Sequence, residues 1–67
     1  MVLTQADLEL LKQLMGAGER GRTIRALATL QRLARRGYVT SRAGGNGLVN
    51  YRITRLGRDA IVEHDAS

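Results

Sequence analysis

The N-terminal part of the chain carries apolar residues at helical spacing. The stripe consists of Leu8, Leu10, Leu11, Leu14 and Met15. Residues three and four apart lie on one face of a helix, so the stripe indicates an amphipathic segment. Thr4 can cap this segment, and Asp7 three residues later completes a capping-box pattern. We therefore expect a helix over residues 4–15, ended by Gly16, and a glycine-rich loop over residues 16–22.

A second helical pattern runs over residues 24–36, between a capping Thr23 and a terminating Gly37. At 100° per residue its apolar side chains gather on one side of the helix. They are Leu27, Leu30, Leu33 and Ala34. Another side carries Arg25, Thr29, Arg32 and Arg36, and Arg22 extends this stripe if the helix begins early. A merely solvated face usually mixes acids with bases, but this one contains no acid.

Two short β-prone runs follow, and they predict a β-hairpin over residues 38–54. The segment between them is AGGNG, residues 43–47, and its Asn46-Gly47 pair tolerates positive φ. With residues 43–47 as the loop, Arg42 pairs with Leu48 and Val39 with Tyr51. One face of the hairpin then carries Val39, Val49, Tyr51 and Ile53, and the other carries Thr40, Arg42, Asn50 and Arg52. The tip comprises Gly44, Gly45, Asn46 and Gly47.

Thr54 can cap a last helix over residues 55–64. The element order is then helix, loop, helix, hairpin, helix, which predicts a small α+β fold. With 67 residues, the chain is expected to form a single domain over residues 1–67.

The charge is distributed unevenly along the chain. A net charge of +5 conceals ten arginines and no acid between Arg20 and Arg58, because all six acids lie in the flanking segments. Such a block requires an anionic partner, and the arginine guanidinium offers phosphate a bidentate fork. A preference for arginine over lysine can arise from a GC-rich genome, but that does not explain the missing acids. We therefore expect contact with nucleic acid.

Other classes of protein fit the composition poorly. The chain has no cysteine, which excludes disulfide-rich miniproteins and thiolate zinc sites. It shows no membrane-spanning run and no signal peptide, so we expect a cytoplasmic protein without a membrane partner. His64 is the only histidine, and neither serine has a base in plausible reach. We therefore expect no enzyme activity, no catalytic residue, no metal site and no cofactor.

The stretch LQRLARRGYV, followed by a glycine-tipped hairpin and YRITRLGRDAI, resembles winged helix-turn-helix proteins of the MarR/PadR kind. The residues that carry the resemblance are Leu30, Leu33, Arg35, Arg36, Gly37, Tyr38, Val39, Tyr51, Ile53, Thr54 and Gly57. The likeness covers residues 24–62. The chain departs from the family in one respect, because only residues 16–22 precede the second helix where a typical member has a full helix.

The resemblance implies that residues 24–36 form the recognition helix and residues 38–54 the wing. Arg22, Arg25 and Thr29 would then read bases in the major groove of double-stranded DNA. Arg32, Arg36, Arg42 and Arg52 would contact the backbone, and the wing-tip residues 44–47 would approach it.

The function expected on this basis is that of a small sequence-specific transcriptional regulator, such as a repressor from a phage or other mobile element. A homodimer through the leucine-rich first helix or the last helix is a further expectation. Two alternatives stay open. One is a protein-interaction module that binds an acidic protein surface or a nucleic-acid-processing machine, and the other is RNA binding.

Overall fold

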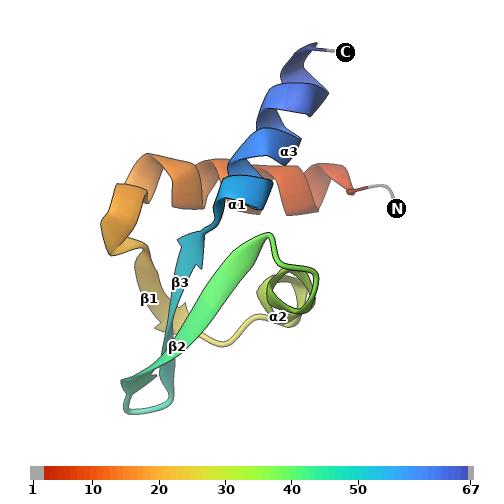
Figure 1. Ribbon diagram of the computed structural model, residues 1–67. Coiled ribbons are helices and arrows are strands. Elements are labelled where there is room, and N and C mark those ends of the chain that lie inside the picture. The colour runs from red at the N-terminus through yellow and green to blue at the C-terminus, as the bar shows by residue number, and fades with distance from the viewer. Residues whose placement is uncertain (1–2, 67) are drawn as a thin grey trace.

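The described residues, 3–66 of the computed structural model, form helices and one antiparallel sheet (Figure 1). The order is α1 (Gln5–Ala17), a 3₁₀ turn η1 (Gly18–Arg20), β1 (Arg22–Arg25), α2 (Ala28–Arg35), β2 (Val39–Gly45), β3 (Leu48–Ile53) and α3 (Arg55–Ala66). The predicted α+β class is confirmed, and the layout is consistent with a small winged-helix-like arrangement. No helix in this part of the chain has the length and apolarity needed to cross a membrane.

α1 begins as the sequence predicts. Thr4 is its N-cap, and the reciprocal hydrogen bonds of a capping box join Thr4 and Asp7. The helix does not end at Gly16, however. It continues to Ala17 and is closed by Gly18, whose φ of 67° suits a residue without Cβ. The predicted loop over residues 16–22 therefore holds the last turn of α1, the turn η1 and the start of a strand.

The helix predicted over residues 24–36 is wrong at its start. Residues Arg22–Arg25 form β1, an edge strand paired antiparallel with β3. This pairing satisfies the backbone groups of the segment and packs Ile24 beside Val49, which a single helical turn could not do. α2 consequently begins at Ala28, without a side-chain hydrogen bond at its N-cap, Leu27. Leu27 was expected in the core and is instead 41% exposed.

The hairpin is confirmed, but its predicted register is wrong by two residues. Only Asn46 and Gly47 form the turn, with φ values of 52° and 75°, as a two-residue hairpin loop requires. Val39 therefore lies opposite Ile53 rather than Tyr51. The short turn pairs Gly45 with Leu48, which shifts the predicted pairing by three residues, and an irregularity between Ala43 and Gly45 reduces the shift to two. Because side chains alternate with a period of two, a shift of two residues leaves the predicted faces unchanged.

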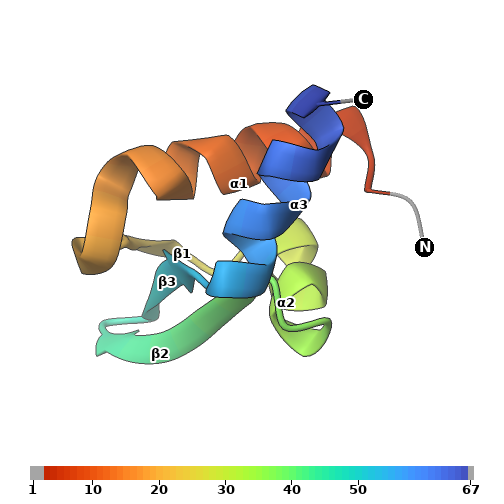
Figure 2. The same ribbon diagram turned by 45° about the horizontal axis from the view of Figure 1, so that its top comes forward.

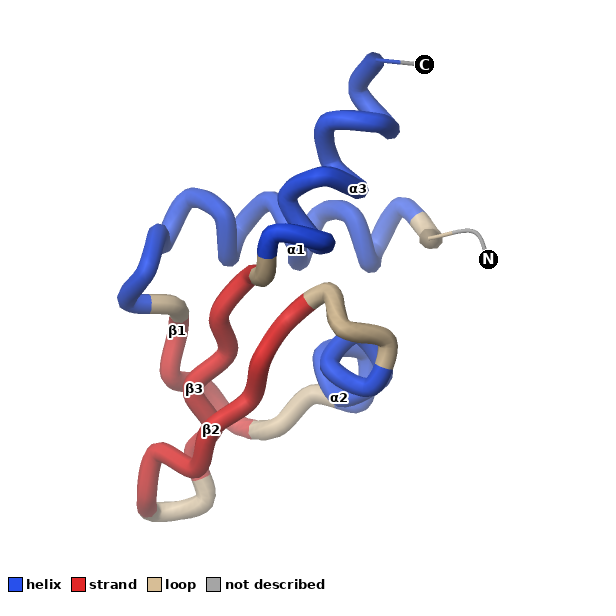
Figure 3. Tube along the Cα trace, viewed as in Figure 1, coloured by secondary structure: helices blue, strands red, loops and turns tan. Residues whose placement is uncertain are grey.

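The sheet has the strand order β1–β3–β2, with β3 in the centre (Figure 3). Its inner face carries Ile24, Val39, Val49, Tyr51 and Ile53, which belong to the core or pack against it. We call the opposite side the outer sheet face, and define it by Thr23, Arg25, Thr40, Arg42, Leu48, Asn50 and Arg52. The helices contact the inner side, and α1 and α3 lie above the strands in Figure 2.

Tyr51 connects the sheet to the helices. Its side chain is fully buried, as expected of a core residue, and its hydroxyl accepts a hydrogen bond of 3.4 Å from the backbone N–H of Leu27. Around it pack leucines from two helices, namely Leu11, Leu14, Leu30 and Leu33. Tyr51 therefore links β3 to the start of α2.

α3 is fixed at its first turn. The Thr54 hydroxyl accepts from the N–H of Gly57, and it lies 2.6 Å and 2.9 Å from the carbonyl oxygens of Gly37 and Tyr38. Gly57 is buried, and a Cβ there would collide with the Tyr38 carbonyl. The helix extends to Ala66, slightly beyond the predicted residue 64.

Candidate nucleic-acid interface

All ten arginines are exposed, and almost none is neutralised within the chain. For the lysine and the arginines, which all lie in the described part of the chain, the ion pairs within 4 Å are Lys12 with Asp65 at 3.4 Å and Arg32 with Asp7 at 3.8 Å. Nine arginines therefore have no carboxylate partner at that distance. Their charge is balanced only by water and counterions, which an anionic partner can displace.

Three of the predicted contact arginines lie together on the outer sheet face, each on a different strand. Arg25 comes from β1, Arg52 from β3 and Arg42 from β2. Arg42 lies opposite Asn50, two residues from Arg52 along β3, so the two arginines are diagonal neighbours about 8 Å apart at their Cα atoms. Arg25 lies opposite Leu48, farther along the same strand. Three guanidinium groups thus share one side of the sheet.

The middle of the outer sheet face is ordered by hydrogen bonds from Asn50. Its amide nitrogen donates to the backbone oxygen of Arg20 and to the hydroxyl of Thr23, both at 3.1 Å. Its side-chain oxygen accepts a weaker bond of 3.4 Å from Arg52 Nε. The terminal nitrogens of Arg52 are left to contact a ligand. The alternating sequence pattern assigned Asn50 to this face but gave no indication that it organises its neighbours.

α2 presents a second basic surface, which we call the α2 face and define by Gln31, Arg32, Arg35 and Arg36. Leu30 and Leu33 are buried on the opposite side of the helix. At 100° per residue, Arg35 lies about 170° from the midpoint of these two leucines, so it projects directly outward. Sequence reasoning did not select Arg35 as a contact residue because it drew the basic stripe through Arg25, which is not helical.

Arg32 is the one arginine with an acidic partner. Asp7 is only 4% exposed, and its carboxylate is held by the Thr4 backbone N–H. The Arg32 side chain, 59% exposed, therefore leans from α2 toward the start of α1. It connects two helices as well as belonging to the α2 face.

Two residues predicted to read bases lie elsewhere. Arg22 is on the inner side of β1, opposite Tyr51, and its Nη1 donates a hydrogen bond of 3.2 Å to Gln13 of α1. Thr29 is half-buried in the first turn of α2. The prediction that Arg22, Arg25 and Thr29 form one helical stripe is therefore wrong, since two of them belong to a strand and alternate between its faces.

The hairpin tip is exposed from Gly44 to Gly47. Gly45, Asn46 and Gly47 all have positive φ. A Cβ on Gly44 would lie 3.1 Å from Thr23 Cγ2, so the lack of a side chain at Gly44 leaves room for the Thr23 methyl group. The tip extends away from the helices, at the lower left of Figure 1.

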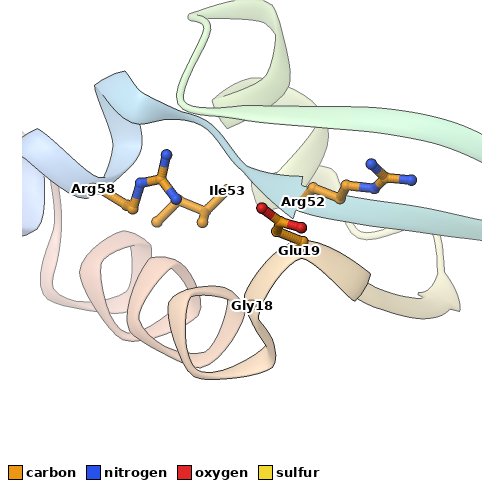
Figure 4. Close-up of a pocket in the computed structure, with 5 residues that line it drawn as sticks. All are labelled: Gly18, Glu19, Arg52, Ile53 and Arg58. Carbon is orange, nitrogen blue, oxygen red and sulfur yellow. The ribbon is translucent and has the colours of Figure 1, made fainter.

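A hollow of about 280 Å³ lies at the other end of β3, where η1 meets α3 (Figure 4). It is lined by Gly18, Glu19, Arg52, Ile53 and Arg58. Arg52 and Arg58 bring positive charge to it, but the Glu19 carboxylate opposes an anion at this point. The hollow marks where the outer sheet face ends.

The remaining acids are Glu9 on α1 and Asp59, Glu63 and Asp65 on α3. Among residues 3–66, no three His, Asp or Glu side chains gather as a metal site would need. Comparisons with protein families, with curated proteins and with solved structures find no match to this chain.

Proposed function

We propose that this protein binds double-stranded DNA and acts as a small transcriptional regulator. The observation that carries the proposal is the charge: ten exposed arginines, nine of them without a carboxylate partner, on a segment that contains no acid. The phosphodiester backbone is the partner that such a surface fits best. The resemblance to winged helix-turn-helix proteins supports DNA rather than another polyanion.

α2 is the element suited to the major groove, because it is the helix that directly precedes the hairpin. Arg35 can bind guanine through a bidentate contact, and Gln31 can do the same for adenine. In this proposal these two side chains take the reading role that the resemblance implies for Arg22, Arg25 and Thr29. Arg36, at the end of the helix, would contact phosphate, and such a contact positions the protein without reading sequence.

A titration tests this function. Fluorescence anisotropy of a labelled mixed-sequence duplex should show binding at about 50 mM salt and strong weakening by about 200 mM, because phosphate contacts release counterions. A set of randomised duplexes, enriched over successive rounds of binding, would then define the operator. Absence of binding at the lower salt concentration would refute the proposal.

A second candidate function has one specific observation in its favour. Ala26 and Leu27, between β1 and α2, and Ala28, the first residue of α2, are exposed in succession and directly follow the exposed Arg25. Such a mixture suits an acidic protein surface, in which arginines and an apolar anchor carry the binding energy. An acidic peptide of the same net charge as the duplex distinguishes the two. DNA binding predicts that the peptide competes poorly, and protein binding predicts the reverse.

Homodimerisation has fewer available surfaces than the sequence suggested. Leu8, Leu11 and Leu14 of α1 are buried within the chain itself. The exposed apolar residues that α3 offers are Leu56 and Val62. We therefore assign a proposed dimer contact to α3, and light scattering of Val62→Asp against the unmodified protein tests it.

A further inference from the structure

The two basic surfaces of this protein are turned to different sides of the molecule. α2 is attached to the core by Leu30 and Leu33, and its arginines project from the other side of the helix. The outer sheet face is on the side of the sheet that faces away from that core. In Figure 1 the hairpin extends to the lower left, whereas α2 is seen end-on at the right of β2.

Because the two surfaces are turned to different sides of the molecule, a straight duplex that lies along one of them leaves the other uncovered. DNA is stiff on this scale, and smooth bending of a site by 40–90° costs about 1–6 kcal/mol. Three further phosphate contacts gain an amount similar to this cost, so bending one duplex offers no advantage over binding a second duplex.

Each surface is nevertheless built to hold phosphate on its own. The outer sheet face has Arg25, Arg42 and Arg52, and none of them has a carboxylate partner within 4 Å. Its other polar members, Thr23, Thr40 and Asn50, add hydrogen-bonding groups and no negative charge. It carries no aromatic side chain that could stack on a base, so its contacts are with the backbone and are independent of sequence.

We propose that the outer sheet face is a second DNA-binding surface, separate from the α2 face, so that one molecule bridges two duplex segments. This inference rests on the proposed function. In this arrangement the α2 face determines any preference for a DNA sequence. The outer sheet face binds a second duplex regardless of its sequence. The consequence is a regulator that joins distant DNA segments, or neighbouring turns of one segment, without requiring a dimer.

The test uses three matched double variants, each of which removes two positive charges. Arg25→Gln with Arg42→Gln alters the outer sheet face, and Arg35→Gln with Arg36→Gln alters the α2 face. None of these four side chains makes an ion pair within 4 Å in the described structure. The control, Arg22→Gln with Arg55→Gln, lies outside both surfaces.

The measurement is capture of a free, labelled mixed-sequence duplex by the same duplex tethered to beads, with the full chain added at about 50 mM salt. Unmodified protein and the control variant should bind the beads and capture free duplex. Each surface variant should still bind the beads and should lose most of the capture. At about 0.1 M salt, two lost phosphate contacts weaken the altered surface by about 60-fold.

Three other outcomes are informative. If unmodified protein binds the beads but captures no free duplex, the bridging proposal is overturned and the proposed function stands. If one double variant abolishes all binding while the other changes nothing, there is a single DNA surface, and any bridging comes from a dimer, which also overturns it. If unmodified protein does not bind the beads, the proposed function is refuted, and the bridging proposal, which rests on it, is refuted as well.

Discussion

The α2 face and the outer sheet face carry similar charge but position it differently. α2 is eight residues long, lacks a side-chain N-cap, and has one of its arginines drawn toward a buried carboxylate. The outer sheet face spans three paired strands, and Asn50 ties β3 to β1 at its centre. Local helical periodicity is enough to place the first set of charges, whereas the second depends on pairing between distant segments. The position of the outer sheet face therefore depends on tertiary contacts, and that of the α2 face on the helix alone.

The largest effect is expected from Tyr51→Ala, because Tyr51 belongs to the strand beneath one surface and holds the start of the other. Truncating a fully buried aromatic side chain typically costs about 3–5 kcal/mol. Denaturant unfolding should show a loss of this size, with Tyr38→Ala, at a half-buried position, as the milder comparison. A loss below about 1 kcal/mol would mean that Tyr51 does not couple the two regions.

A charge reversal on each surface comes next. Arg25→Glu with Arg35→Glu should weaken duplex binding by about 10- to 100-fold at about 0.1 M salt, since every bound duplex then meets a damaged surface. Arg22→Glu with Arg55→Glu is the control of equal charge. Arg32 is unsuitable here, because a glutamate at that position would face Asp7. Equal weakening by both pairs would indicate that net charge alone governs binding.

Gly57→Ala tests the close contact between α3 and Tyr38, the residue that lies just before β2 in the connection from α2. The added methyl group would collide with the carbonyl of Tyr38 and lie 2.8 Å from Ile53 Cγ1. Overpacking of this kind costs about 1–3 kcal/mol. Gly16→Ala, inside α1 with no atom within 4 Å, is the matched control, and it should stabilise the protein by about 0.5–1 kcal/mol. Equal changes in the two variants would contradict the close packing at Gly57.

The smallest effect is expected from Asp7→Asn, which keeps an acceptor for the Thr4 N–H but removes the charge that holds Arg32. Arg32 then becomes available to phosphate. Duplex affinity should rise several-fold, and the salt dependence at the α2 face should steepen by about 0.9 per added contact. An unchanged salt dependence would show that Arg32 does not reach DNA even when released.

Local patterns in the sequence predict part of this structure well. The capping box at Thr4, the turn at Asn46 and Gly47, and the two faces of the hairpin all follow from short-range rules. β1 does not, because the segment around Thr23 and Ile24 forms a strand only when β3 is present to pair with it. That pairing delays the start of the helix to Ala28 and leaves Leu27 exposed.

The candidate interface was predictable as a set of charges but not as surfaces. The acid-free segment identified the arginines, and alternation in the hairpin placed Arg42 and Arg52 together. Arg25 joined them through the unforeseen strand, and Arg35 emerged once the helix had its true start. A strand turns neighbouring residues to opposite faces, so the same correction that brought Arg25 to the outer sheet face sent Arg22 away from it.

Two separate DNA-binding surfaces are best distinguished from one by how steeply salt weakens the binding of one short duplex to the unmodified protein. Each phosphate contact contributes about −0.9 to the slope of log affinity against log salt concentration. Two or three arginines on a single surface therefore predict a slope between about −2 and −3, whereas simultaneous use of six would give about −5. A slope near −5 would contradict separate surfaces, and a flat line or no binding would contradict the DNA-binding function itself.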